Sequence, residues 1–232
     1  MPVVVFANTK GGSGKTTASL VLGCTLARTA TVTIIDADPR HPVTEWAKKP
    51  GKSDRLTVIT NRTEDGIIDE IDNATTKSQF VIVDLEGAGS RRMDFAMNRA
   101  DMVIIPMKEE RQDAMAAVDT IKAVITAGKA NRPVRRIPFS ILLTQGRAAV
   151  KSRTARREAD AIRKHPQIDV FDVELHQRDA YSAMYTTGGG IHDLDPREVN
   201  NTLNAIENAE AFAAEVIRKL RALRQEQARE VA

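Results

Sequence analysis

The sequence predicts an α/β fold: a single doubly wound, mostly parallel sheet with helices on both faces. Short runs rich in valine and isoleucine recur along the chain and are continuous rather than alternating, as in strands buried on both faces of a parallel sheet. Longer segments with helical spacing separate these runs, which is the pattern of a doubly wound sheet. The 232 residues show no internal repeat or linker, so we expect one domain over residues 1–232.

Seven apolar runs are predicted as strands. In chain order they are Val3–Ala7, Val32–Ile35, Leu56–Thr60, Phe80–Leu85, Met102–Pro106, Ile137–Thr144 and Val170–Leu175. In doubly wound sheets, ligands bind outside the carboxyl ends of the strands. The loops that follow these runs are therefore where we expect the chemistry.

Seven segments are predicted as helices, at about residues 15–29, 42–49, 65–76, 91–98, 111–128, 150–164 and 197–224. In the last of them apolar residues recur at helical spacing: Leu203, Ile206, Phe212, Val216, Ile217, Leu220 and Leu223. This pattern fits a terminal helix packed on the domain or a helix that lies on a membrane. We favour packing, because Glu207, Glu210 and Glu215 would face anionic lipid.

The composition excludes several classes of protein. Apolar residues make up 42 % of the chain, too many for a mainly disordered protein. Cys24 is the single cysteine, so we expect no intramolecular disulfide and no thiolate metal site. The first apolar run is shorter than a signal peptide or a spanning helix requires. We therefore expect a cytoplasmic protein.

The charge is unevenly distributed. The chain holds 34 Lys and Arg against 31 Asp and Glu, a net charge of +3. Residues 122–164 contain twelve basic and two acidic side chains, so this segment carries +10 and the rest of the chain carries −7. A segment so basic favours a polyanionic partner.

The loop after the first strand, Asn8 to Thr17, reads NTKGGSGKTT. Its glycines let backbone N–H groups turn inward around phosphate oxygens, and the next helix adds its positive end. Lys15 is then expected to reach the β- and γ-phosphates, Thr16 to ligate Mg²⁺ and Thr17 to contact the α-phosphate. A glycine-rich turn without a nucleotide is disfavoured, because strand, loop, lysine and helix occur in the right order. The predicted nucleotide-binding residues of this loop are Lys10, Gly11, Gly12, Ser13, Gly14, Lys15, Thr16 and Thr17.

This loop departs from the usual phosphate-loop spacing, which places a glycine where Thr9 stands. The deviant loop KGGSGKTT resembles that of the ParA/MinD family of P-loop ATPases, and the resemblance covers roughly residues 1–195. It implies a P-loop ATPase domain that uses ATP, ADP and Mg²⁺. It also implies a homodimer that forms on ATP binding, in which Lys10 reaches the partner's phosphates. A cation inserted in this way offsets charge on the transferred phosphoryl group.

The second predicted strand is followed by two carboxylates, Asp36 and Asp38. With Pro39 they resemble the D-x-D-P motif of the same family. The resemblance implies that Asp36 supports Mg²⁺ and that Asp38 positions the attacking water. The predicted catalytic residues are therefore Lys10, Lys15 and Asp38. A turn or a helix cap is the structural alternative for the pair.

The fourth predicted strand reaches Asp84 in the manner of a Walker B strand. We expect Asp84 to contact Mg²⁺ through water, so that Thr16, Asp36 and Asp84 form the predicted metal site. The glycine-rich residues 85–90 resemble a switch that senses the γ-phosphate. Glu86 in this switch is either a second catalytic carboxylate or an exposed side chain, and we favour the exposed side chain.

Two later residues are assigned by the same resemblance. Gln145 follows the strand whose loop lies near the nucleobase in the family, so it is predicted to hydrogen-bond adenine. Arg178 stands in the segment HQRDAY, where it serves the nucleotide pocket or DNA, or pairs with Asp179 or Asp172.

Branches of the family differ in what they act on. The single cysteine excludes the nitrogenase-reductase branch, which needs cysteine ligands. The DNA-binding branch fits the basic segment best, because Lys and Arg contacts to phosphate give non-specific, salt-dependent affinity; a solvated surface helix is the alternative. The predicted DNA-binding residues are Arg147, Lys151, Arg153, Arg156, Arg157, Arg178, Arg218 and Arg221.

The expected function is that of a ParA-type ATPase that dimerises on ATP, binds double-stranded DNA non-specifically and acts in plasmid or chromosome partition. The expected partners are DNA, a second copy of the chain, and either a DNA-bound ParB-like adaptor or a relaxosome component. The expected location is the cytoplasm, on the nucleoid, without a membrane partner. The alternatives are a VirC-type ATPase of conjugative or T-DNA transfer and a MinD-like ATPase at a membrane surface.

Overall fold

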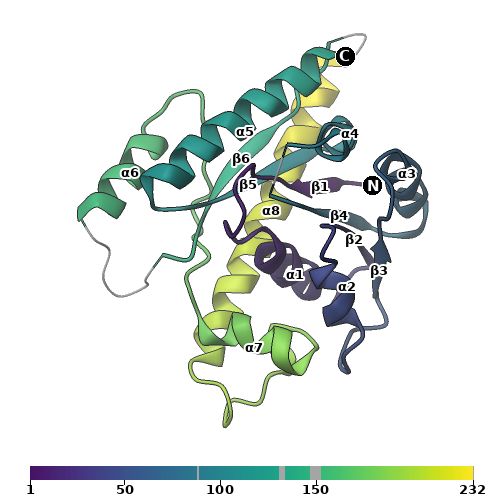
Figure 1. The fold of residues 1–232 in the computed structure, drawn as a ribbon, viewed down its shortest axis with the longest axis vertical. Helices are drawn as coiled ribbons and strands as arrows, with labels where there is room; N and C mark the ends of the chain where they lie inside the picture. The colour runs from purple at the N-terminus through teal and green to yellow at the C-terminus, as the bar shows by residue number, and fades with distance from the viewer. Residues whose placement is uncertain (88, 131–133, 147–152, 232) are drawn as a thin grey trace.

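A computed structural model describes residues 1–87, 89–130, 134–146 and 153–231, without the side chains of residues 153–156, 230 and 231. A six-stranded sheet lies at its centre, with strand order β3-β2-β4-β1-β5-β6 and every pairing parallel (Figure 1). The strands are β1 (Val3–Phe6), β2 (Val32–Ala37), β3 (Leu56–Thr60), β4 (Phe80–Leu85), β5 (Met102–Lys108) and β6 (Phe139–Thr144). The predicted α/β class is confirmed.

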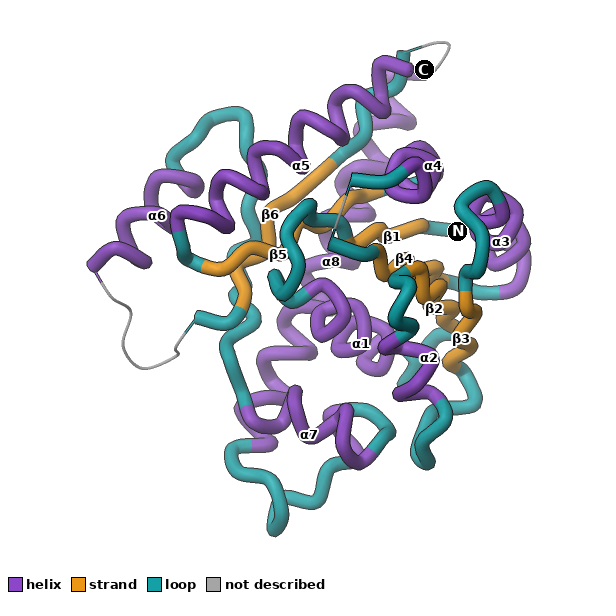
Figure 2. The backbone as a smooth tube through the Cα atoms, viewed as in Figure 1, coloured by secondary structure: helices purple, strands orange, loops and turns teal. Residues whose placement is uncertain are grey.

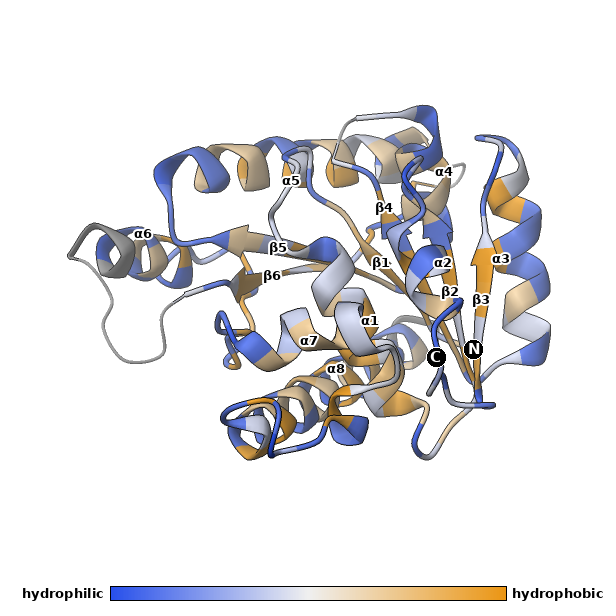
Figure 3. Cartoon of the chain, turned by 60° about the horizontal axis from the view of Figure 1, so that its bottom comes forward, coloured by the Kyte–Doolittle hydropathy of each residue, from blue (hydrophilic) through white to orange (hydrophobic). Residues whose placement is uncertain are grey.

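The helices cover both faces of this sheet. They are α1 (Lys15–Leu26), α2 (Pro42–Ala47), α3 (Gly66–Lys77), α4 (Arg91–Arg99), α5 (Arg111–Ala130), α6 (Arg153–Arg163), α7 (Asp179–Thr187) and α8 (Thr202–Val231), with a short 3-10 turn, η1 (Ile191–Asp193). On one face α1, α2, α7 and α8 pack against side chains such as Phe6 and Ile34. On the other, α3 to α6 pack against their neighbours Val5 and Ile35 (Figure 3). Successive strand residues alternate between two apolar cores, which is why the runs are continuous in sequence.

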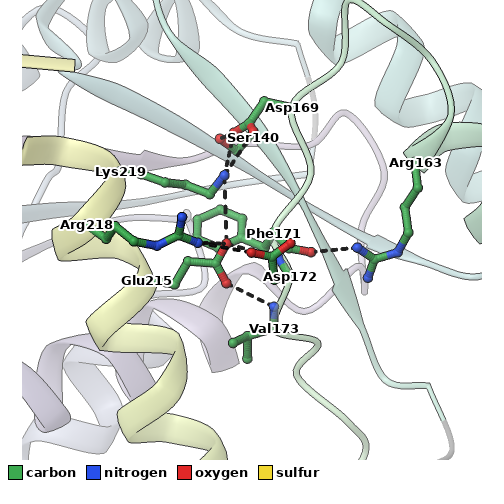
Figure 4. A network of polar contacts seen from close by, with 9 residues as sticks. All are labelled: Ser140, Arg163, Asp169, Phe171, Asp172, Val173, Glu215, Arg218 and Lys219. Carbon is green, nitrogen blue, oxygen red and sulfur yellow. Dashed lines mark hydrogen bonds and ion pairs between the residues drawn. The ribbon is translucent and has the colours of Figure 1, made fainter. Parts of the chain in front are cut away.

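The seventh predicted strand, Val170–Leu175, is wrong as a strand. Only its two ends bridge to β6, at Val170 and Leu175. Between them the backbone N–H groups of Asp172 and Val173 both donate to the Glu215 carboxylate of α8, at 2.9 Å each (Figure 4). A side chain from a distant helix therefore replaces the ladder that a continuous strand would make.

Ion pairs around Glu215 fix this junction further. Lys219 pairs with Asp169 at 2.7 Å, and Arg218 pairs with Asp172 at 3.0 Å. The Lys219 ammonium also lies 4.9 Å from the centre of the Phe171 ring (Figure 4), a cation–π distance. These contacts hold the segment after β6 against α8.

Replacing Glu215 with alanine is expected to lower the free energy of unfolding by about 2 kcal/mol, because two backbone donors lose their acceptor and two cations lose a neighbour. Urea unfolding monitored by circular dichroism measures this change. Glu210→Ala on the same helix is the matched control: Glu210 is half-exposed and pairs with Arg28 at 3.0 Å, so its loss is expected to cost less than about 1 kcal/mol. Equal losses in the two variants would contradict the assigned role of Glu215.

Two helices differ from the sequence expectation. Helix α7 was not predicted, since its sequence DAYSAMYTT has no apolar stripe of useful length. Helix α8 begins at Thr202 and continues to Val231, beyond the expected residues 197–224. Phe212, Val216 and Leu220 on α8 are buried in the core, which confirms the prediction of a packed terminal helix. In the described part of the chain, no helix has the length and apolar character that crossing a bilayer requires.

Candidate nucleotide site

The loops that carry the predicted chemistry meet at the carboxyl edge of the central strands. In the parallel register Asp84 of β4 lies between Phe6 of β1 and Asp36 of β2. The loop that leaves β1 therefore begins beside two carboxylates from neighbouring strands. Figure 2 shows the loops after these strands gathered at that edge, above the start of α1.

The phosphate loop has the backbone that its glycines predict. Gly12 and Gly14 have φ angles of 74° and 97°, in the left-handed region that favours glycine. Gly14 is the N-cap that directly precedes α1, so the backbone N–H groups at the start of α1 face the concave side of the loop. This arrangement fits an anion such as phosphate.

The deviant position is anchored to a helix outside the loop. The Thr9 N–H donates to Thr120 Oγ1 of α5 at 3.0 Å, and Thr9 Oγ1 donates to the Ala116 carbonyl at 3.2 Å. Asn8 Oδ1 accepts the Lys10 N–H at 2.8 Å. The hydroxyl of Thr9 thus adds a contact to α5 that a glycine could not make.

Lys15 lies inside the loop that it is predicted to serve. Its side chain is buried, and its ammonium donates to the carbonyls of Asn8 and Lys10 at 3.3 and 3.2 Å. Burial lowers the pKa of Lys15, against the attraction of Asp84 and Asp38. A buried cation whose contacts are only backbone carbonyls fits a site that receives phosphate oxygens.

The two buried carboxylates, Asp36 and Asp84, have oxygens that are available to bind a metal ion. Among the described residues, neither oxygen of Asp84 and only one oxygen of Asp36 has a hydrogen-bond partner; Asp36 Oδ2 accepts the Thr44 N–H at 2.7 Å. Burial, with a smaller contribution from Asp36, raises the pKa of Asp84 to about 7, although Thr16 and Lys15 oppose the shift. Burial also raises the pKa of Asp36. Such unpaired buried oxygens fit a hydrated Mg²⁺.

The described side chains do not enclose a metal by themselves. Within the described residues no group of three His, Cys, Asp or Glu side chains is placed to ligate an ion. Magnesium commonly binds through one or two carboxylates together with substrate phosphates and water. The predicted set of Thr16, Asp36 and Asp84 therefore fits a metal that arrives with a nucleotide.

Asp84→Asn is expected to stabilise the nucleotide-free protein at high pH. Because the pKa of Asp84 is raised on folding to about 7, the folded state holds a proton that the unfolded state releases between about pH 4 and pH 7, and stability falls as the pH rises through that window. The asparagine variant lacks this loss, which is on the order of 3 kcal/mol. Urea unfolding of both proteins at about pH 5 and about pH 8 measures it. An equal pH dependence in the two proteins would contradict the burial of a charged Asp84.

Lys10 is held within its own chain. Its ammonium makes an ion pair with Asp113 of α5, a fully buried carboxylate whose other oxygen has no partner. A lysine that reaches a neighbouring subunit must first leave Asp113. The predicted action in trans thus requires a rearrangement of this contact.

Glu86 is not an exposed side chain, and this expectation was wrong. Its side chain is 23 % exposed and lies 3.8 Å from the guanidinium of Arg92 on α4. Arg92 is buried, and the sequence analysis assigned it no role. The pair lies beside the phosphate loop, because a Cβ atom on Gly87 would come within 2.6 Å of Gly11.

A cavity of about 220 Å³ adjoins the phosphate loop on the side of α7. Gln145 lines it, as predicted for the nucleobase, and its amide donates to the Gly12 carbonyl at 3.4 Å. Arg178 lines it as well, and its Nε lies 3.5 Å from Asn208 Oδ1 of α8. Gly14 and Thr17, both predicted to bind the nucleotide, line it too. Sequence reasoning assigned no site role to four further side chains of this cavity, His176, Gln177, Tyr181 and Tyr185. The two tyrosines are four residues apart on α7, a signal that only a correct helix assignment reveals.

The predicted DNA-binding residues are dispersed over several elements. Arg147 and Lys151 lie outside the described residues, as do the side chains of Arg153 and Arg156 on α6. Arg157 and Arg221 are exposed. Arg218 pairs with Asp172 at 3.0 Å and with Glu215 at 3.3 Å, so Asp172 is occupied by Arg218, and the contact of Arg178 is with Asn208.

The chain is similar in sequence to known proteins. A family model described as "VirC1 protein" matches residues 1–223. The chain is 34 % identical to "Protein ParA" of Rhizobium radiobacter, over 95 % of this chain and 98 % of that protein.

Solved structures share the fold. Apo McdA of Cyanothece superposes with a TM-score of 0.73 at 16 % identity, over 90 % of this chain and 99 % of that one. A variant of the same protein, "McdA(D38A)", has been solved in complex with ATP. A ParA family ATPase from Chlorobium tepidum TLS superposes with a TM-score of 0.69 at 16 % identity, over 93 % and 98 % of the two chains.

Proposed function

Because the chain belongs to the VirC1 family of ParA-type P-loop ATPases, we propose that it binds and hydrolyses ATP, dimerises on ATP and binds DNA in the dimeric state. Hydrolysis returns it to a monomer with low affinity for DNA. The observation that carries the proposal is the convergence of a buried Lys15, whose ammonium donates to two carbonyls of its own loop, with the unpaired oxygens of Asp36 and Asp84 at one sheet edge. The charge of Lys15 is opposite to that of a triphosphate, and the charge of the two carboxylates is opposite to that of its cation.

Each group has a place in the reaction. Lys15 and the N-terminus of α1 hold the β- and γ-phosphates, and Gln145 with the cavity beside α7 takes the nucleoside. Magnesium, when bound, neutralises charge that develops on the phosphates, and Thr16, Asp36 and Asp84 are the residues that hold it. Asp38, at the end of β2, orients the attacking water. Lys10, once released from Asp113, completes the site of the partner copy.

The uneven charge supports DNA as the polyanion. Arg157 and Lys164, in or next to α6, are exposed, and they belong to the +10 segment of the chain. The phosphate loop lies outside this segment, so ATP and DNA contact different cations. A protein whose DNA affinity is controlled by a nucleotide needs this separation.

Reversing Arg157 and Lys164 to glutamate is expected to weaken binding to double-stranded DNA by at least about tenfold and to reduce the slope of log affinity against log salt by about 2, since two phosphate contacts are lost. ATP binding is expected to remain. Fluorescence anisotropy at several salt concentrations measures both effects. Arg221→Glu with Arg224→Glu on α8 has the same change in net charge and tests the alternative site, since Arg221 is also a predicted DNA-binding residue. If the α8 variant loses affinity and the α6 variant does not, the site lies on α8.

The whole proposal is tested by asking whether dimerisation and DNA co-sedimentation both require ATP. We expect a dimer, and DNA in the pellet, with ATP and Mg²⁺ but not with ADP. Liposomes serve as the competing surface. Retention by liposomes and not by DNA would favour a MinD-like function, which the packing of the α8 apolar face against the core disfavours.

The role in the cell has two candidates. A role in partition, with a DNA-bound ParB-like adaptor that stimulates hydrolysis, follows from the similarity to ParA. A role in conjugative or T-DNA transfer, with a relaxosome component as partner, is favoured by the match of the family model to residues 1–223. Stimulation of ATP hydrolysis by one of these purified partners and not by the other decides between them. Both roles place the protein on DNA in the cytoplasm.

A further inference from the structure

We propose that Arg92 is a positioning residue that couples the switch loop at Glu86 to the loop that carries Asp38. The inference rests on the proposed ATPase function and concerns how the same site senses its nucleotide. Arg92 lies in the first turn of α4, immediately after the switch. It contacts both loops, at Ala37 and at Glu86.

The contacts of Arg92 join three parts of the chain. Its Nη1 donates to the carbonyl of Ala37 at 3.3 Å and lies 3.8 Å from Glu86 Oε1. Ala37 directly precedes Asp38, and Glu86 follows Asp84 by two residues. One buried guanidinium therefore bridges the ends of β2 and β4, the strands whose carboxylates form the predicted site.

Arg92 also influences a second carboxylate, Glu70. The charge of Arg92 favours the ionised form of Glu70 on α3 and so opposes the increase in the pKa of Glu70 that burial causes. Glu70 accepts the Asn61 side-chain amide at 3.0 Å, and the Asn61 backbone N–H donates to the Asp36 carbonyl at 2.9 Å. The charge of Arg92 thus acts on a carboxylate whose hydrogen bonds lead through Asn61 to the strand that carries Asp36.

The same switch residues touch the phosphate loop. Gly87 packs so closely on Gly11 that a Cβ atom at Gly87 would lie 2.6 Å from the Gly11 Cα and N atoms. A phosphate loop that adjusts to a γ-phosphate therefore displaces Gly87, and with it Glu86. Because Arg92 pairs with Glu86, the displacement reaches the Ala37 carbonyl and the position of Asp38.

Arg92 makes fewer hydrogen bonds than its guanidinium can donate, as expected of a side chain that changes partners. It is buried, and its Nε has no hydrogen-bond partner in the part of the chain that the structure describes. Its ion pair with Glu86 is longer than a hydrogen-bonded pair. A buried, partly satisfied polar network has little margin when one member moves. A shift of Glu86 toward or away from Arg92 therefore changes the hydrogen bond that Arg92 donates to the Ala37 carbonyl.

The fluorescence of Trp46 reports on the loop that carries Asp38. It is the only tryptophan of the chain, it is buried on α2, and its Nε1 donates to the Gly189 carbonyl at 3.2 Å. Helix α2 follows the Asp38 loop, and the Thr44 N–H of this helix donates to Asp36. Its emission is therefore expected to differ between the complexes with AMPPNP and with ADP.

The experiment compares Arg92→Lys with Arg91→Lys in the full chain. Both changes keep the charge and lose the planar guanidinium, but Arg91 is exposed, with Asp65 and the ring of Phe95 as its neighbours. We expect Arg92→Lys to abolish the Trp46 difference and to lower kcat by at least about tenfold, with KM and the melting temperature nearly unchanged. Arg91→Lys is expected to behave as the unmodified chain. Glu86→Gln is expected to add little further loss to Arg92→Lys, since both act through one contact.

Three results would overturn the inference. They are a Trp46 difference that persists in Arg92→Lys, a loss in which kcat, KM and thermal stability all change together, and additive effects of the Glu86 and Arg92 changes. Failure of the proposed function has another signature: the unmodified chain would then not hydrolyse ATP. The fluorescence comparison still decides on Arg92 in that case, because it requires nucleotide binding and not turnover.

Discussion

Replacing Lys15 with alanine is expected to abolish ATP binding at ordinary nucleotide concentrations. The ammonium lies in the phosphate loop, buried, with only the carbonyls of Asn8 and Lys10 as contacts. Charge-assisted bonds to phosphate contribute about 3 kcal/mol or more in such a site, so the dissociation constant is expected to rise by at least about a hundredfold. Titration with a fluorescent ATP analogue measures this.

The fold is expected to survive the Lys15 change. Burial lowers the pKa of Lys15, so a protonated Lys15 costs the nucleotide-free fold some stability, and the alanine variant is expected to be at least as stable. Lys10→Ala is the control within the same loop, because Lys10 pairs with Asp113 of α5 and does not lie in the cradle. It is expected to retain ATP binding while losing turnover. Unchanged ATP affinity in Lys15→Ala would refute the assignment of the loop.

Replacing Asp38 with alanine is expected to trap an ATP-bound dimer. Asp38 is buried at the end of β2, and its carboxylate accepts the Arg40 N–H at 2.9 Å. Removal of a group that positions the attacking water lowers turnover by about 10²- to 10⁴-fold, while Lys15, Asp36 and Asp84 still hold the nucleotide. ATP turnover and light scattering, followed together over time, measure the two effects.

The control for the Asp38 change is Glu45→Ala on α2, an exposed carboxylate that pairs with Lys48 at 2.6 Å. Loss of that pair is expected to leave turnover and dimerisation unchanged. A monomeric Asp38→Ala protein with ATP bound would show that Asp38 acts in assembly and not in hydrolysis. Normal turnover in the variant would remove Asp38 from the reaction.

The sequence predicted the part of the site that a local pattern specifies. Lys15 and the glycines of its loop were found because an anion cradle depends on consecutive backbone N–H groups and on residues that tolerate positive φ, as Gly12 and Gly14 do. Asp36 and Asp84 were found because each follows a continuous apolar run, and the carboxyl ends of neighbouring parallel strands lie together.

What the sequence missed depends on contacts between distant residues. The run Val170–Leu175 has the composition of a strand, but Glu215, forty or more residues later, takes two of its N–H groups. Helix α7, with Tyr181 and Tyr185 in the cavity, carries no stripe that predicts it. Glu86 was expected to be exposed, although Arg92 lies only six residues away, because the sequence does not show that the turn into α4 brings the two side chains together.

The sequence by itself determined the fold class, the phosphate loop and the carboxylates beside it, because hydrophobic periodicity and backbone chemistry act over a few residues. Only the tertiary structure decided that Lys10 rests on Asp113, that α8 is packed on the core and that Arg92 joins two loops. The physical reason is that buried charges must find partners wherever the fold brings them within reach, and sequence separation does not limit that choice.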